Sequence, residues 1–274
     1  MEIQDFPAPY KLVKGRHGWF LANPHDVYVG RALITYGEYG ELEWQLVRQL
    51  LRPGMDAVEV GANIGGLTVP MARALAATGS RLLAVEPQLT IFQNLCANLA
   101  LNGLTNVRTE NCACGDVPGF VTFAAPDIHR EGNFGGIVMR QDGLGDQRMR
   151  LVTLDELLPP GFQPGLIKLD VEGFEQKVLE GARQTIAAHR PLLYLENDQV
   201  DKSKALIEWL WAAKYRLFWH APELFNPANF TGQAENLYPQ VSSFNMLALP
   251  EEMKQEMQGF ILITDSSVHP LRRG

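Results

Sequence analysis

Short apolar runs alternate with longer helical patterns along most of the chain from residue 55 onward. The short runs are aliphatic and end at glycine, proline or an acid. Between them, apolar residues recur every three or four positions. This alternation predicts successive strand–helix–strand units, which is an α/β fold with a doubly wound, mostly parallel sheet. The predicted strands cover 55–60, 81–85, 107–112, 120–124, 166–169, 192–195, 215–220 and 244–249, and the predicted helices 67–77, 91–102, 154–158, 174–187 and 202–213.

Three parts are predicted along the chain. Residues 1–50 form an N-terminal extension with an amphipathic cap helix over about 41–51, residues 51–250 form the main domain, and residues 251–274 form a C-terminal tail. The polar, glycine-rich stretch 125–150 interrupts the main domain. Such a long loop is uncommon in a compact domain, so we expect a functional lid or a disordered insertion there.

Composition narrows the class of protein. Hydrophobic residues make up 46% of the chain, enough for a full core. The net charge of −7 argues against a nucleic-acid partner, because phosphate binding usually requires an excess of bases. Three cysteines are too few for a disulfide scaffold and indicate a reducing compartment.

The chain carries no pattern of export or membrane insertion that we recognise. Its first residues lack the basic and apolar segments of a secretory signal. The longest uncharged run, 87–107, is interrupted by amide side chains and predicts an amphipathic segment rather than a membrane span. We therefore expect a cytoplasmic protein.

A glycine-containing turn follows the first predicted strand. Gly61 and Gly65 lack a Cβ and would let a ligand approach the backbone, although such a turn can also be purely structural. A dinucleotide fingerprint would require glycine at position 63, where Asn63 stands. The preceding acid, Glu59, suits a ligand with a positively charged amine. S-adenosylmethionine (SAM) has such an amine and no phosphate.

A second acid stands at the end of the next predicted strand. Glu86 follows the glycine turn by about 20 residues, where a carboxylate can accept hydrogen bonds from both ribose hydroxyls. On its own, Glu86-Pro87 could be only a strand end. In this order and context, the turn and the acid predict a site for a nucleoside cofactor.

Several motifs in the same order resemble the FkbM-type SAM-dependent methyltransferases, over about residues 35–200. The matching segments are 36–39, 55–66, 84–87, 111–116, 151–157, 166–175, 178–182 and 191–196. The resemblance implies the Rossmann-like class I methyltransferase fold, a seven-stranded sheet with an antiparallel last strand and helices on both faces. It also implies methyl transfer from SAM to a hydroxyl oxygen of a small-molecule or carbohydrate acceptor.

The resemblance also places residues against the cofactor. Gly61, Asn63 and Gly65 would line the methionine part, with Glu59 near its amine, and Glu86 would hold the ribose. Cys112 and Ala113 would border the adenine. The full set is Glu59, Gly61, Asn63, Gly65, Glu86, Pro87, Cys112, Ala113 and Asp170. A Cys112/Cys114 metal site is disfavoured, because no further cysteine or nearby histidine completes it.

Candidate catalytic residues lie at the ends of predicted strands, where open α/β sheets bind ligands. They are Asp170, Glu172, Glu196 and His220. A hydroxyl acceptor benefits from a general base, although alignment alone can supply most of the rate. Other interpretations stay open: Asp170 or Glu172 could cap the helix near residue 174, and His220 could be a structural histidine.

Two further interpretations concern the part of the site that would bind the methyl acceptor. Asp170, Glu196 and Asn197 form a set similar to the Mg²⁺ ligands of catechol-type O-methyltransferases, although the main prediction contains no metal. The aromatic and amide side chains of 219–238 could recognise a polar acceptor or simply pack a loop. The functional alternatives are methylation of nitrogen or of a protein side chain, a non-catalytic SAM-binding domain and, disfavoured by Asn63, an NAD-dependent dehydrogenase.

Overall fold

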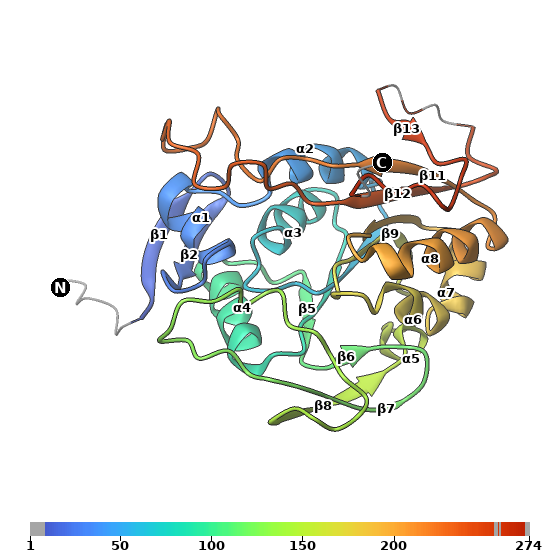
Figure 1. Cartoon of the computed structure of the whole chain (residues 1–274), viewed down its shortest axis with the longest axis horizontal. Helices are drawn as coiled ribbons and strands as arrows, with labels where there is room; N and C mark the ends of the chain where they lie inside the picture. The colour runs from blue at the N-terminus through green and yellow to red at the C-terminus, as the bar shows by residue number, and fades with distance from the viewer. Residues whose placement is uncertain (1–8, 255–256, 258, 272–274) are drawn as a thin grey trace.

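The computed structural model describes residues 9–254, 257 and 259–271 (Figure 1). The predicted absence of a secretory signal concerns residues that lie outside this part. An eight-stranded sheet has the order β13-β11-β12-β10-β9-β3-β4-β5. Its strands are β3 (Asp56–Val60), β4 (Leu82–Val85), β5 (Val107–Glu110), β9 (Pro164–Leu169), β10 (Leu192–Glu196), β11 (Tyr215–His220), β12 (Asn245–Pro250) and β13 (Ile261–Leu262).

The strand directions confirm the predicted fold. The five strands from β10 to β5 are parallel, and β12 runs antiparallel between β10 and β11. These seven strands form the predicted sheet with its antiparallel last strand. The described part of the predicted C-terminal tail adds β13, which pairs antiparallel with β11 at the sheet edge.

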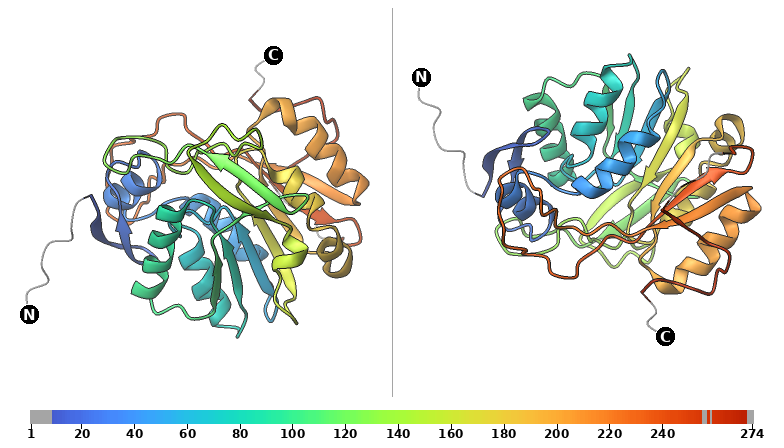
Figure 2. Two further views of the ribbon diagram at one scale, coloured as in Figure 1. Left: turned by 90° about the horizontal axis from the view of Figure 1, so that it is seen from below. Right: turned by 90° about the horizontal axis from the view of Figure 1, so that it is seen from above.

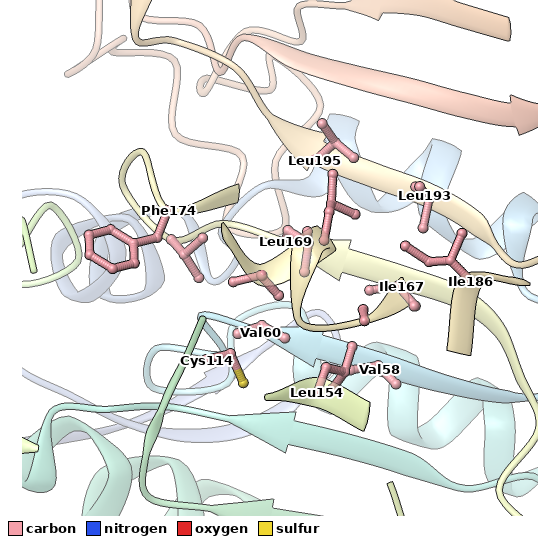
Figure 3. Close-up of a cluster of buried hydrophobic side chains, with 14 of the residues drawn as sticks. Val58, Val60, Cys114, Leu154, Ile167, Leu169, Phe174, Ile186, Leu193 and Leu195 are labelled. Atoms are coloured by element: carbon pink, nitrogen blue, oxygen red, sulfur yellow. The ribbon is translucent and has the colours of Figure 1, made fainter. Parts of the chain in front are cut away.

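Helices cover both faces of the sheet (Figure 2). One face packs against α2 (Glu41–Leu50), α3 (Thr68–Ala76) and α4 (Leu89–Leu101), and the other against α5 (Leu154–Leu157), α6 (Glu175–Glu180), α7 (Arg183–His189) and α8 (Val200–Ala212). Alternate strand residues face opposite sides, as Val58 and Ala57 do. Figure 3 shows Val58, Ile167 and Leu193, from three adjacent strands, in the cluster of the second face.

The predicted helix 174–187 is divided into α6 and α7 at Gly181. A Cβ on Gly181 would lie 2.0 Å from the carbonyl oxygen of Gly115, so the chain passes too close there for any side chain. After the break, the Asp155 carboxylate accepts hydrogen bonds from the backbone N–H groups of Gln184 and Thr185 at the start of α7. Tertiary contacts therefore end one helix and begin another.

The N-terminal extension contains a hairpin and two helices, which are β1 (Lys11–Gly15), β2 (Gly18–Ala22), α1 (Val29–Tyr36) and the cap helix α2 at its predicted place. A small separate sheet is formed by β6 (Ala113–Cys114), β8 (Gln147–Val152) and β7 (Gly119–Phe123). Strand β8 takes the end of the predicted loop 125–150. The rest of that loop is attached to the extension by two backbone hydrogen bonds, in which the Val27 N–H donates to the Gly132 carbonyl and the Gly132 N–H donates to the His25 carbonyl.

No helix in the described part of the chain combines the length and the apolar character needed to cross a bilayer.

Candidate active site

A cavity of about 290 Å³ opens at the carboxyl ends of β3, β4, β9 and β10. Ligands of open α/β sheets bind at this edge. Its lining contains six acids and, among the described residues, a single basic side chain, Lys168. The acids are Glu59, Glu86, Asp170, Glu172, Glu196 and Asp198.

The turn after β3 forms the floor of the cavity. Gly61 has a φ of 87°, and a Cβ on it would lie 1.8 Å from the carbonyl oxygen of Asp170, so only glycine lets β3 and β9 approach. Gly61 and Asn63 line the cavity as predicted. Gly65 is not among the lining residues, because it faces Leu95, and Gly66 lines the cavity in its place.

Glu86 stands just beyond β4 and is 4% exposed. Its Oε2 accepts a hydrogen bond of 2.9 Å from the backbone N–H of Asn63, and its Oε1 accepts one of 2.9 Å from that of Gln88. Burial raises the pKa of Glu86 to about 7. The two backbone donors fix the carboxylate at the junction of two cavities, since Glu86 lines both.

The second, narrower cavity measures about 30 Å³ and has both apolar and polar walls. Phe123, Ile137, Met139 and Val171 line it together with the predicted Pro87, and so do the polar side chains of Glu86, Gln88, Asp170 and Glu172. Three of the apolar walls come from β7 and the loop that follows it, and the loop is held by a 2.8 Å hydrogen bond from the Gln88 side chain to the Phe134 carbonyl. The apolar residues of this slot beside Glu86 suit contact with the face of a flat heteroaromatic ring.

Cys112 and Ala113, predicted to border the adenine, line neither cavity. Both are buried in the core with Cys114. Ile137 and Met139 of the long loop line the slot beside Glu86 in their place. The only sequence signal for these residues was the unusual length of that loop.

Charged groups face each other at the end of β9. Lys168 is 2% exposed, and its ammonium lies 3.3 Å from Asp170 Oδ2 and 3.6 Å from Glu43 Oε1. The Asp170 side chain is 40% exposed toward the cavity. Glu59 is buried and accepts a hydrogen bond of 2.7 Å from the Thr68 hydroxyl, and burial raises its pKa to about 7. The predicted Glu59 and Asp170 thus lie together at the floor.

The far end of the cavity gathers three carboxyls. One carboxylate oxygen from each of Glu172, Glu196 and Asp198 lies within 4.8 Å of the others. Burial and neighbouring acids raise the pKa of Glu172 to about 8 and that of Glu196 well above its ordinary value. Glu196 Oε2 is shielded from solvent and has no hydrogen-bond partner among the described residues. The predicted Glu172 and Glu196 are therefore neighbours on the cavity wall.

The helix-capping interpretation of Glu172 is not supported. Glu175 accepts hydrogen bonds from the backbone N–H groups of Val171 and Gly173, and so stabilises the turn before α6. Glu172 instead has a φ of 52° and lines the cavity. A left-handed conformation in a residue other than glycine is strained and is common at functional sites.

Two residues that the sequence suggested for the site, His220 and Asn197, do not line the cavity. His220 Nδ1 lies 2.8 Å from the Tyr194 hydroxyl, outside the cavity lining, and burial lowers the His220 pKa to about 4. The Asn197 amide donates to Ser203 Oγ and Met246 Sδ. Asn197 does not line the cavity, so the interpretation of Asp170, Glu196 and Asn197 as a Mg²⁺ set is not supported.

A further part of the lining, which sequence reasoning missed, comes from residue 224 and from the segment that leads into β12, where Asn245 pairs with Glu196. These lining residues are Leu224, Val241, Ser242, Ser243, Phe244 and Asn245. The aromatic residues of 219–238 mostly pack a loop instead, as Phe225 and Tyr238 do against Tyr36. A 2.7 Å hydrogen bond from the Asn226 amide to Glu38 ties this loop to the N-terminal extension.

The fold and cavity define a doubly wound α/β protein with a cavity at the carboxyl edge of its parallel strands. Residues 59–217 match the methyltransferase FkbM domain. The chain therefore belongs to the FkbM methyltransferase family. No curated protein matches the chain.

Solved structures with similar folds include a methyltransferase FkbM from Methylobacillus flagellatus KT, at 16% identity and a TM-score of 0.48. That similarity covers 83% of this chain but 48% of the other, so the chain spans about half the length of that protein. The O-methyltransferase TomG from Streptomyces achromogenes, solved with SAM, is 14% identical over 77% of this chain and 78% of its own, with a TM-score of 0.46.

Proposed function

We propose that this chain transfers the methyl group of SAM to a hydroxyl oxygen of a small-molecule or glycan acceptor. The observation that carries the proposal is the Glu86 carboxylate, fixed by two backbone N–H groups between two cavities. A carboxylate at this strand end can accept both ribose hydroxyls of a nucleoside. Family membership supplies the type of reaction.

The lining residues offer contacts suited to each part of SAM. The apolar residues Phe123, Ile137 and Met139 of the slot suit adenine, and Glu86 suits the ribose. Because Gly61 has no side chain, the backbone of this turn is open to contact with the methionine part of SAM. When bound, SAM supplies an electrophilic methyl group on a positively charged sulfur.

The acceptor end can orient a hydroxyl group and take its proton. Glu172 and Glu196 would hold the acceptor oxygen, and Asp170 lines the same cavity beside Lys168. A base is most useful when its pKa is near the working pH, which the value of about 8 at Glu172 satisfies. Ser242 and Ser243 add neutral polar contacts suited to a polyol. His220 and a metal ion have no part in this proposal.

Exchange of Glu86 tests the proposal directly. We expect Glu86→Ala to weaken SAM binding by about 1–3 kcal/mol, the loss typical of hydrogen bonds to a charged group. The measurement is titration calorimetry with SAM, S-adenosylhomocysteine (SAH) and NADH. Glu110→Ala is the matched control, because Glu110 ends the neighbouring strand β5 and lines neither cavity.

The ligand series separates the alternatives. Binding of NADH without SAM would favour a dehydrogenase and overturn the proposal, and an unchanged affinity in Glu86→Ala would mean that Glu86 does not hold the ribose. Binding of SAM without turnover on any hydroxyl or amine acceptor would favour a non-catalytic domain. The cytoplasmic location expected from the sequence stays a prediction.

A further inference from the structure

Lys168 places one positive charge at the floor of an acidic cavity. Burial lowers the pKa of Lys168, but the carboxyls of Asp170, Glu43 and Glu59 outweigh burial and raise it, so the side chain stays charged. No other lysine, arginine or histidine is found among the described residues that line the cavity. An anionic group of a ligand therefore meets a cation only here.

Tyr39 supplies a hydrogen-bond donor to the same cavity. Tyr39 lies between α1 and α2 and lines the cavity. A Cβ on Gly66 would lie 3.1 Å from the Tyr39 ring, so the glycine makes room for this side chain. Its hydroxyl has no hydrogen-bond partner among the described residues. Burial, followed by the negative charges of Asp170 and Glu43, raises the pKa of Tyr39, so the hydroxyl keeps its proton.

The sheet order separates Lys168 from Glu86 by a distance that the amino-acid chain of SAM can bridge. Glu86 follows β4 and Lys168 lies on β9, with β3 between the two strands. Neighbouring strands are about 4.8 Å apart, so the two strands are about 10 Å apart. In SAM and SAH, the 5′ carbon, the sulfur and a three-carbon chain join the ribose to the α-carboxylate, which is long enough to bridge this gap.

We infer that Lys168 and Tyr39 receive the α-carboxylate at the amino-acid end of the cofactor. The inference rests on the proposed function. A carboxylate taken out of water needs a cation or hydrogen-bond donors, and Lys168 is the one cation among the described residues that line the cavity. Asp170 and Glu59, beside Lys168, suit the adjacent ammonium group. The two ends of the zwitterion thus meet opposite charges on neighbouring strands.

The test compares SAH with 5′-methylthioadenosine, which keeps the nucleoside and the thioether but lacks the amino acid. Wild-type protein is expected to bind SAH more tightly. In Lys168→Met the SAH affinity should fall about 10- to 100-fold, and in Tyr39→Phe about 3- to 10-fold. Affinity for 5′-methylthioadenosine should stay within about twofold in both variants, since neither residue lines the slot beside Glu86. Lys204→Met and Tyr10→Phe, outside the cavity lining, should change neither affinity.

The outcomes separate this inference from the proposed function. A wild-type protein that binds neither nucleoside overturns the proposed function and the inference with it. Equal wild-type affinities for the two nucleosides overturn the inference alone, as do variants with unchanged SAH affinity. Equal loss of both ligands in Lys168→Met and Tyr39→Phe would also overturn it, because the two side chains would then act on the whole site. Retained binding of 5′-methylthioadenosine shows that a variant is folded.

Discussion

We expect Gly61→Ala to destabilise the protein by about 3–5 kcal/mol, because two penalties add at this position. The new Cβ would lie 1.8 Å from the Asp170 carbonyl oxygen, which forces the central strands β3 and β9 apart. The φ of 87° is also unfavourable for alanine. Since this turn is the floor of the cavity, SAH binding should fall below detection. Urea unfolding and calorimetry measure the two effects.

The variant Gly79→Ala introduces backbone strain without a steric overlap and is therefore the control for Gly61→Ala. Gly79 has a φ of 70°, and a Cβ on it would meet no atom within 4 Å. This variant should lose only the roughly 1–2 kcal/mol of a left-handed alanine and should bind SAH as wild type does. Equal destabilisation in Gly61→Ala and Gly79→Ala would show that β3 and β9 have room for a side chain at Gly61.

The elements of the fold could be predicted because local signals coincide with their ends. The run to Val60 stops at Gly61, and the run to Val85 stops at Glu86-Pro87, so periodicity and chain-breaking residues gave the same boundaries. The division of the predicted helix 174–187 had no such signal. Gly181 is required by the approach of Gly115, a contact between segments more than 60 residues apart, and glycine inside a helical pattern does not reveal its partner.

The residues of the candidate site, too, could be predicted only in part from the sequence. Glu86 could be predicted because its position at a strand end fixes its place on the sheet edge. His220 also ends a strand, yet the Tyr194 hydroxyl binds its ring, and Ser203 likewise binds the amide of Asn197. Only side-chain partners decide which strand-end residues reach the ligand. The slot residues Ile137 and Met139 belong to a loop whose path depends on contacts with the N-terminal extension.

We expect the melting temperature of the ligand-free protein to fall by roughly 5–10 °C between pH 7 and 8.5. Burial raises the pKa of Glu59, Glu86 and Glu175 to about 7 and that of Glu172 to about 8, above the ordinary value of 4.5. The folded state therefore holds more protons than the unfolded chain, and stability present at low pH is lost as pH rises through these values. His220, lowered to about 4, opposes this trend only at lower pH. Differential scanning calorimetry measures the shift.

The same ionisation should strengthen cofactor binding. Because the sulfonium of SAM is permanently positive and its ribose hydroxyls need an ionised Glu86, we expect SAM affinity to rise about 3- to 10-fold from pH 7 to 8.5. SAH, which lacks the sulfonium charge, should gain less. Glu172→Gln should reduce the pH dependence both of the melting temperature and of SAM binding, whereas Glu110→Gln should leave both unchanged. A SAM affinity that falls over this pH range would contradict the assignment of the acidic cavity to a cationic cofactor.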